Sequence, residues 1–109
     1  MVDVSFHQLK IIKKILNKYV PDCEVRVFGS RVTGTTKDYS DIDLVIVGKE
    51  KIPSNIFYAL KEAFELSELP FRTDVLDWNA ISKEFRIVID KQYEVIQKAD
   101  SPIKNGNSE

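Results

Sequence analysis

Two aspartates separated by one residue are the part of this sequence most suited to chemistry. Asp41 and Asp43 open the apolar run that continues to Val47. Residues two apart on an extended strand point to the same face, so both carboxylates project from one side. Like charges held that close raise each other's pKa, and a cation between them removes the penalty. Carboxylates favour hard ions such as Mg²⁺, which keeps several waters and usually shares phosphate oxygens with its ligand.

A Gly-Ser pair twelve residues upstream of these aspartates has the properties of a phosphate site. Gly29 and Ser30 directly follow the apolar run VRVF. Glycine allows a positive φ and lets the backbone approach a ligand. If Ser30 opens a short helix, its free N–H groups form an anion site. Arg31 has two interpretations, which are a contact with a triphosphate and a surface ion pair with a nearby acid.

These two motifs together resemble a known signature. Gly29-Ser30, ten intervening residues and Asp41-Ile42-Asp43-Leu44 resemble the pattern of the DNA polymerase β-like nucleotidyltransferase superfamily. GSRVTG followed by SDIDLVIV is most similar to its minimal branch, the small prokaryotic nucleotidyltransferases encoded beside HEPN-domain proteins. The resemblance extends to about Lys98. It implies an α/β (α+β) fold of the polymerase β palm-like type, a small mixed sheet with helices mainly on one face.

The third expected strand, Phe71 to Leu76, offers two candidates for a third acid. Asp74 and Asp77 are three residues apart, so strand alternation points them to opposite faces. Val75 is the natural partner of the apolar face of the second strand, which places Asp74 on the carboxylate face. The family pattern also sets its third acid at this Asp-Val position. Asp77 is expected to cap the segment that follows.

Periodicity and capping signals predict the remaining elements. Ser5 and Gln8 form a capping box at the start of the first helix. Leu66 is a candidate for the buried side of the second helix, and Val88 is expected to be buried on the third. The expected helices are Ser5 to Tyr19, Pro53 to Leu69 and Ser82 to about Lys91, and the expected strands are Glu24 to Phe28, Asp41 to Val47, Phe71 to Leu76 and a short piece from Tyr93 to Ile96.

Composition limits the class of protein. The 109 residues fit one domain over residues 1–98, followed by a disordered polar tail over 99–109. A net charge of −1 gives no electrostatic argument for direct nucleic-acid binding. One cysteine excludes an internal disulfide and fits a reducing compartment. No apolar run reaches membrane-spanning length and no signal-peptide pattern is present, so a cytoplasmic protein is expected.

The resemblance also implies an activity and roles for the residues that carry it. The reaction would transfer a nucleoside monophosphate, AMP from ATP, to an acceptor hydroxyl. Asp41 and Asp43 would hold two Mg²⁺ ions, and Asp74 would ligate one of them and is a candidate to take the acceptor's proton. Gly29, Ser30 and Arg31 would bind the nucleotide phosphates. The implied partner is a HEPN-domain toxin, which the transferase would silence as an antitoxin, in some systems by adding AMP to a tyrosine.

Several alternatives stay open from the sequence. The domain could silence a partner by contact alone, with the acids unused, or it could be a free-standing transferase acting on a small molecule such as an aminoglycoside. Trp78 could stack on a base or a partner, or pack at the sheet edge. The lysines of the first helix form either a solvated face or a docking surface for an acidic partner or nucleic acid.

Overall fold

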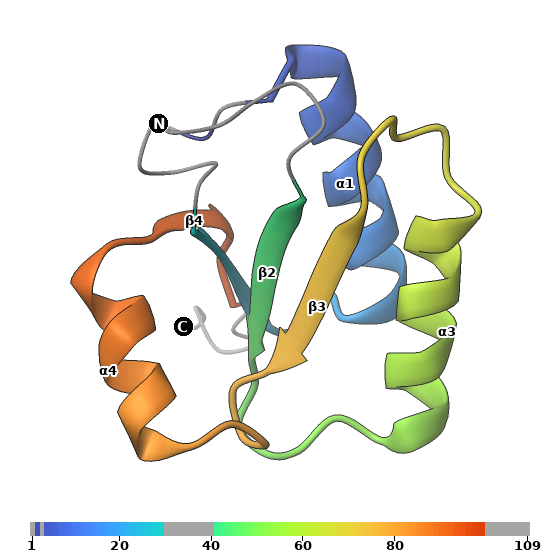
Figure 1. Cartoon of the computed structure of the whole chain (residues 1–109). Coiled ribbons are helices and arrows are strands. Elements are labelled where there is room, and N and C mark those ends of the chain that lie inside the picture. The colour runs from blue at the N-terminus through green and yellow to red at the C-terminus, as the bar shows by residue number, and fades with distance from the viewer. Residues whose placement is uncertain (1, 3, 30–40, 100–109) are drawn as a thin grey trace, which may run out of the picture.

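A mixed four-stranded sheet with helices on both faces organises the chain (Figure 1). The computed structural model describes residues 2, 4–29 and 41–99. The strand order is β3-β2-β1-β4, where β2 and β3 run parallel and the other pairs are antiparallel. The fold expected from the resemblance is therefore confirmed. In chain order the elements are α1 (Phe6–Tyr19), β1 (Glu24–Phe28), β2 (Ile42–Val47), α3 (Ser54–Glu65), β3 (Thr73–Asp77), α4 (Lys83–Lys91) and β4 (Glu94–Gln97).

The first helix forms as its sequence predicts. The Ser5 hydroxyl accepts the Gln8 N–H, and the Gln8 side chain accepts the Ser5 N–H, so both halves of the capping box are present. The helix buries Ile12 and Leu16 completely. After the helix ends at Tyr19, the Val20 N–H still bonds the Leu16 carbonyl and turns the chain into β1. Short-range signals therefore determine both ends of this element.

Two predicted elements differ from the structure by two residues or more at one end. The second predicted helix was expected to reach Leu69, but α3 ends at Glu65, and Leu66 is 80% exposed instead of buried. The Ser67 hydroxyl bonds the Phe64 carbonyl and also accepts the Leu69 N–H, so the chain turns before Pro70. The third strand also begins two residues later than predicted, at Thr73, and extends to Asp77.

One face of the sheet carries the main core. α1 and α3 lie next to each other behind the sheet in Figure 1 and cover this face. The predicted apolar side of β2 is confirmed, because Ile42, Leu44 and Ile46 are fully buried here. The other members of the cluster come from every strand and from both helices: Ile12, Leu16, Val20, Val25, Val27, Leu60, Phe64, Phe71, Val75 and Ile96. This layer fixes the sheet from behind and leaves the opposite face for the site.

The opposite face is partly covered by α4, which Figure 1 shows on the far side from α1 and α3. Arg26 and Phe28 alternate with the core residues of β1, and they contact Asp90 and Phe85 of α4. Val45, on the same face, is completely buried. The face that carries the carboxylates is therefore closed at its middle, a feature that strand alternation alone did not predict.

The outer side of α4 differs from its prediction. Ile89 is buried, but Val88, which was expected to be buried, is 56% exposed and its neighbour Ile87 is 60% exposed. Ser82 caps the helix by accepting the Phe85 N–H. Since the helix presents only one side to the sheet, neighbouring apolar residues cannot all be buried. None of the helices in the described residues is long and apolar enough to span a bilayer.

Candidate active site

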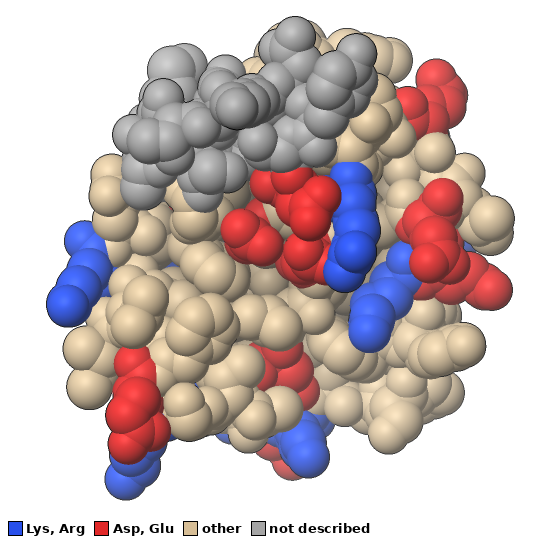
Figure 2. All heavy atoms as spheres, viewed as in Figure 1, with Lys and Arg blue, Asp and Glu red and all other residues tan. Residues whose placement is uncertain are grey.

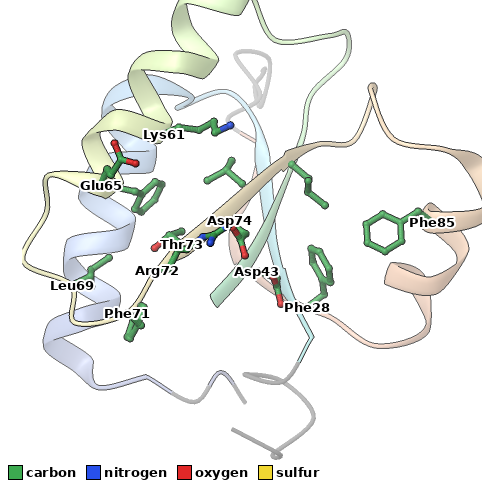
Figure 3. A pocket seen from close by; sticks show the side chains of 13 residues that line it. Phe28, Asp43, Lys61, Glu65, Leu69, Phe71, Arg72, Thr73, Asp74 and Phe85 are labelled. Carbon is green, nitrogen blue, oxygen red and sulfur yellow. The ribbon is translucent and has the colours of Figure 1, made fainter. Parts of the chain in front are cut away.

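A row of three side chains crosses the sheet at one end of its open face. In the strand register Phe28 pairs with Asp43, and Asp43 pairs with Asp74. Register partners in neighbouring strands point to the same face. Figure 3 shows the Asp43 and Asp74 side chains close together, with Phe28 on the far side of Asp43. The pairing of β2 with β3 therefore brings together two of the three acids that the sequence predicts.

The surroundings of Asp43 shift the pKa of its carboxyl group. Its side chain is half-buried, and burial raises the pKa of the Asp43 carboxyl. The negative charges of Asp74 and then Asp41 raise it further. Asp41 lies just before β2 and is exposed. The concentration of negative charge at Asp43 is the electrostatic condition that a bound cation would relieve.

Asp77 has the structural role expected of it. It is 6% exposed and lies at the other end of β3 from Asp74. Its carboxylate accepts the Asn79 N–H at 3.0 Å, which caps the turn after the strand. It also accepts the Ile52 N–H at 2.9 Å and so ties the start of α3 to β3. Asp74 and not Asp77 is therefore the acid of β3 that faces the site.

Gly29 closes the site on the β1 side. It has a φ of +81°, a conformation that L side chains rarely adopt. A Cβ atom placed on it would collide with the Asp43 carboxylate. The turn after β1 therefore requires glycine for two reasons, its backbone conformation and its close approach to a site acid. Ser30 and Arg31, the other predicted phosphate-binding residues, lie outside the described residues.

A hollow of about 940 Å³ lies beside the acids and is lined by both Asp43 and Asp74. Phe28 and Phe85 form one wall, with ring centroids 5.9 Å apart in an edge-to-face arrangement. Lys61 and Glu65 reach the hollow from α3 (Figure 3). Acidic side chains gather at the middle of this side of the molecule, with basic ones directly next to them (Figure 2). The hollow therefore combines apolar walls with charged groups of both signs.

Arg72 is a residue of this site that the sequence reasoning missed. Its Nε lies 3.1 Å from Asp74 Oδ1, and the Arg72 side chain is 75% exposed. The signal was available, because residues two apart on a strand share a face and Arg72 stands two before Asp74. The Phe28–Phe85 wall was not detectable in this way, since its two rings come from elements far apart in the chain.

The carboxylate oxygens of the site are the kind of group that binds a hard divalent cation. Carboxylate oxygens are the ligands that Mg²⁺ prefers, and burial, followed by the charges of Asp74 and Asp41, raises the pKa of the Asp43 carboxyl. As they stand, no three acidic, histidine or cysteine side chains of the described residues are grouped closely enough to hold a metal ion. Asp74 is paired with Arg72 through its Oδ1, and a carboxylate can ligate a metal through its other oxygen.

Neither Trp78 nor the single cysteine, Cys23, lines the hollow beside the acids. Trp78 lies against two guanidinium groups, Arg26 at 4.9 Å and Arg86 at 5.2 Å from the ring centroid, which supports its packing interpretation. Burial raises the pKa of the Cys23 thiol, and the negative charges of Asp22 and Asp77 raise it further. A raised thiol pKa lowers the thiolate fraction, which argues against a nucleophilic role.

The chain belongs to the family described as "Nucleotidyltransferase domain", whose sequence pattern matches residues 9–99. It is 45% identical over 103 residues to a Haemophilus influenzae protein named "Probable protein adenylyltransferase MntA", and this match covers 94% of this chain and 90% of the relative. The family therefore agrees with the resemblance that the Gly-Ser and Asp-Ile-Asp motifs carry.

Solved structures agree with the fold. One chain of a toxin-antitoxin crystal structure with AMP-PNP superposes with a TM-score of 0.70 at 22% identity, over 83% of this chain and 73% of that one. A chain from a complex of a tri-AMPylated Shewanella oneidensis HEPN toxin with its MNT antitoxin gives 0.64 at 19% identity, over 84% and 71%. At these identities the likeness establishes the fold alone.

Proposed function

We propose that this protein is a magnesium-dependent adenylyltransferase that moves AMP from ATP to a hydroxyl of a HEPN-domain partner and silences the partner as its antitoxin. The observation that carries the proposal is the register of Asp43 and Asp74 on one face, with Asp41 just before β2. The 45% identical relative named as a probable protein adenylyltransferase supports the reaction class. The structural neighbours described as toxin-antitoxin complexes support the kind of partner.

The chain's own residues supply positioning and charge. Asp41, Asp43 and Asp74 would hold two Mg²⁺ ions, whose chemistry is to neutralise phosphate charge and to lower the pKa of the acceptor hydroxyl. Because Gly29 has no side chain, the backbone of the β1 turn lies directly against the Asp43 carboxylate and would stand beside phosphates bound there. Ser30 and Arg31 would bind the same phosphates.

The transfer is a substitution at the α-phosphorus of ATP. The acceptor oxygen forms a new bond to that phosphorus, and the bond from the α-phosphorus to the bridging oxygen breaks as pyrophosphate leaves. The acceptor's proton passes to Asp74 or to water. Asp74 suits this role because it lies beside Asp43 at the open side of the site, and its side chain is 37% exposed. Catalysis would then rest on positioning and charge neutralisation, as in other phosphoryl transfers.

Intact mass spectrometry tests the proposal directly. The protein and the HEPN-domain protein of the same genome are incubated with ATP and Mg²⁺, and both masses are measured. We expect one or more AMP units on the partner. The Asp41→Asn/Asp43→Asn variant is expected to transfer at least about 100-fold more slowly, because it removes charge stabilisation of the transition state.

The matched control is Asp22→Asn, since Asp22 is exposed and does not line the hollow beside the acids. It removes the same charge as one catalytic substitution and should transfer AMP at the rate of the wild type. If the two proteins form a complex and the partner gains no mass, the transfer proposal is wrong and silencing by contact replaces it. A mass gain on an aminoglycoside, with none on any protein, would indicate a small-molecule transferase instead.

A further inference from the structure

The strand that carries Asp74 has a free edge. β3 pairs with β2, and no strand of the described residues pairs with its other side. The Ile42 N–H bonds the Arg72 carbonyl at 2.9 Å, and the Trp78 N–H bonds the Ile46 carbonyl at 3.0 Å. Backbone groups alternate in direction along a parallel strand, so even-numbered residues of β3 face β2. The N–H and C=O groups of Thr73 and Val75 therefore face outward.

The hollow beside the acids follows this edge and not one face of the sheet. It is lined by every residue of the run 71–76. A cavity over one face of a strand would be lined by every second residue, because successive side chains alternate. Its walls also come from both layers, Phe85 of α4 on one side and Phe64 of α3 on the other. The edge of β3 is therefore the floor of an open channel between α3 and α4.

The side chain of Thr73 is separate from the outward backbone groups of this edge. Its Oγ1 is buried, and no described residue makes a hydrogen bond to it. Buried hydroxyls in folded proteins are normally bonded, and an unbonded one costs stability. Thr73 is also the first residue of β3, next to the register pair of Asp74 and Asp43. Thr73 pairs in register with the fully buried Ile42, so its side chain points to the face covered by α1 and α3, and only its backbone groups belong to the outward edge.

The strand order gives Asp43 a different neighbour on each side. Gly29, at the end of β1, lies on one side of Asp43, and Asp74 lies on the other side. Phosphates that approach along the β1 turn leave the β3 side for the acceptor. An acceptor that comes from the β3 side reaches Asp74 along the channel at this edge.

We propose that the free edge of β3 binds an extended segment of the acceptor protein as an added strand, with the modified hydroxyl residue in register with Asp74. This inference rests on the proposed function, because it assigns the acceptor site of that reaction. An extended polypeptide satisfies the outward N–H and C=O groups as a small molecule cannot. Register partners hold their Cβ atoms about 4.5–5.5 Å apart, which brings a serine, threonine or tyrosine hydroxyl to the Asp74 carboxylate.

Residue-resolved hydrogen exchange of the wild-type protein tests the added strand without any mutation. The amides of Asp74 and Leu76 point to β2 and should already be protected in the free protein. The amides of Thr73 and Val75 should exchange faster, and slow at least tenfold when the HEPN-domain protein is added with ATP and Mg²⁺. Binding that leaves the Thr73 and Val75 amides as fast as before would overturn the proposal.

A proline substitution tests the same edge through the reaction. Thr73→Pro removes the outward N–H, and proline is tolerated at the first residue of an edge strand. The matched control is Thr73→Val, which keeps the N–H and loses only the hydroxyl. We expect the KM for the acceptor protein to be about tenfold higher in Thr73→Pro than in Thr73→Val, the size expected for a lost backbone bond. The affinity for ATP, measured by calorimetry, should be the same in both variants.

The two experiments separate this proposal from the proposed function. AMP transfer at equal KM in both Thr73 variants, with unprotected outer amides, overturns the added strand and leaves the transferase intact. A partner that binds and protects the outer amides but gains no AMP overturns the transfer and keeps the docking edge. No binding and no transfer overturn both. If Thr73→Pro does not fold, the hydrogen-exchange pattern of the wild-type protein still shows whether the edge of β3 binds an added strand.

Discussion

At the scale of single residues, Gly29 shows how tightly the turn after β1 approaches a site acid. Its φ of +81° and the collision of any Cβ with the Asp43 carboxylate both oppose a side chain. We expect Gly29→Ala to lower the free energy of unfolding by more than about 1 kcal/mol, because alanine is strained at positive φ even without the collision. Urea denaturation followed by circular dichroism measures the change.

A double-mutant cycle separates the two causes. In an Asp43→Ala background the carboxylate is gone, so Gly29→Ala should cost less than it does in the wild type. The remaining cost is the strain of the backbone. Equal costs in the two backgrounds would show that the collision with Asp43 contributes nothing.

Asp43 makes the stability of the metal-free protein depend on pH. Burial and the charges of Asp74 and Asp41 raise the pKa of the folded-state carboxyl. A raised pKa means that the folded state favours the protonated form. The contribution of the Asp43 carboxyl to the free energy of unfolding is fully present below the unfolded-state pKa of about 3.9. This contribution is lost as the pH rises through the folded-state pKa.

Asp43→Asn should therefore stabilise the protein in the presence of EDTA at neutral pH, because the amide carries no charge to bury. The difference between the variant and the wild type should shrink as the pH falls and vanish below the unfolded-state pKa. Chemical denaturation at a series of pH values measures it. A difference that does not change with pH would contradict the assigned cause, since only a titrating carboxyl produces the dependence.

At the scale of elements, one arginine ties α4 and β4 to the sheet. The Arg26 guanidinium lies 4.9 Å from the Trp78 ring centroid and 4.3 Å from that of Tyr93. It also pairs with Glu24 and with Asp90 of α4 at 3.1 Å, and its side chain is only 15% exposed. The planar group therefore contacts two rings and two carboxylates, which positions the helix that carries Phe85.

Removal of this group should loosen that side of the site. Arg26→Ala is expected to lower the free energy of unfolding by about 2 kcal/mol, since it deletes stacked and charge-assisted contacts that are largely desolvated. Arg26→Lys should recover less than half of the loss, because an ammonium group cannot stack between two rings. Thermal denaturation of the three proteins measures the order. If the lysine variant is as stable as the wild type, the positive charge alone accounts for the stabilisation that Arg26 provides.

At the scale of the whole molecule, binding at the acids should stabilise the fold. A ligand that binds only the folded state at about 100 times its Kd adds about 2.7 kcal/mol. For a domain of this size that raises Tm by on the order of 10 °C. We expect this rise with Mg²⁺ and a non-hydrolysable ATP analogue, and its loss in Asp41→Asn/Asp43→Asn. Asp22→Asn is the control, and an equal rise in the double variant would place the ligand elsewhere.

The site shows which inferences were accessible from the sequence. The shared face of Asp43 and Asp74, the glycine at the β1 turn and the capping role of Asp77 all follow from strand period and turn chemistry, which act over a few residues. Arg72 was missed although its spacing from Asp74 predicts a shared face. The exposure of Leu66 and Val88 could not be predicted, because helical period gives the direction of a side chain but not how far a neighbouring layer extends.

The sequence by itself determined the approximate bounds of the helices and strands, the apolar face of β2 and the shared face of Asp43 and Asp74, because capping, alternation and periodicity depend on neighbouring residues. Only the tertiary structure decided that β3 lies at the edge, parallel to β2, and that α4 closes the middle of the carboxylate face. Strand order and layer coverage depend on contacts between segments far apart in the chain. The channel along β3 exists because β3 is the end strand of the sheet, and no other strand of the described residues pairs with its outer side.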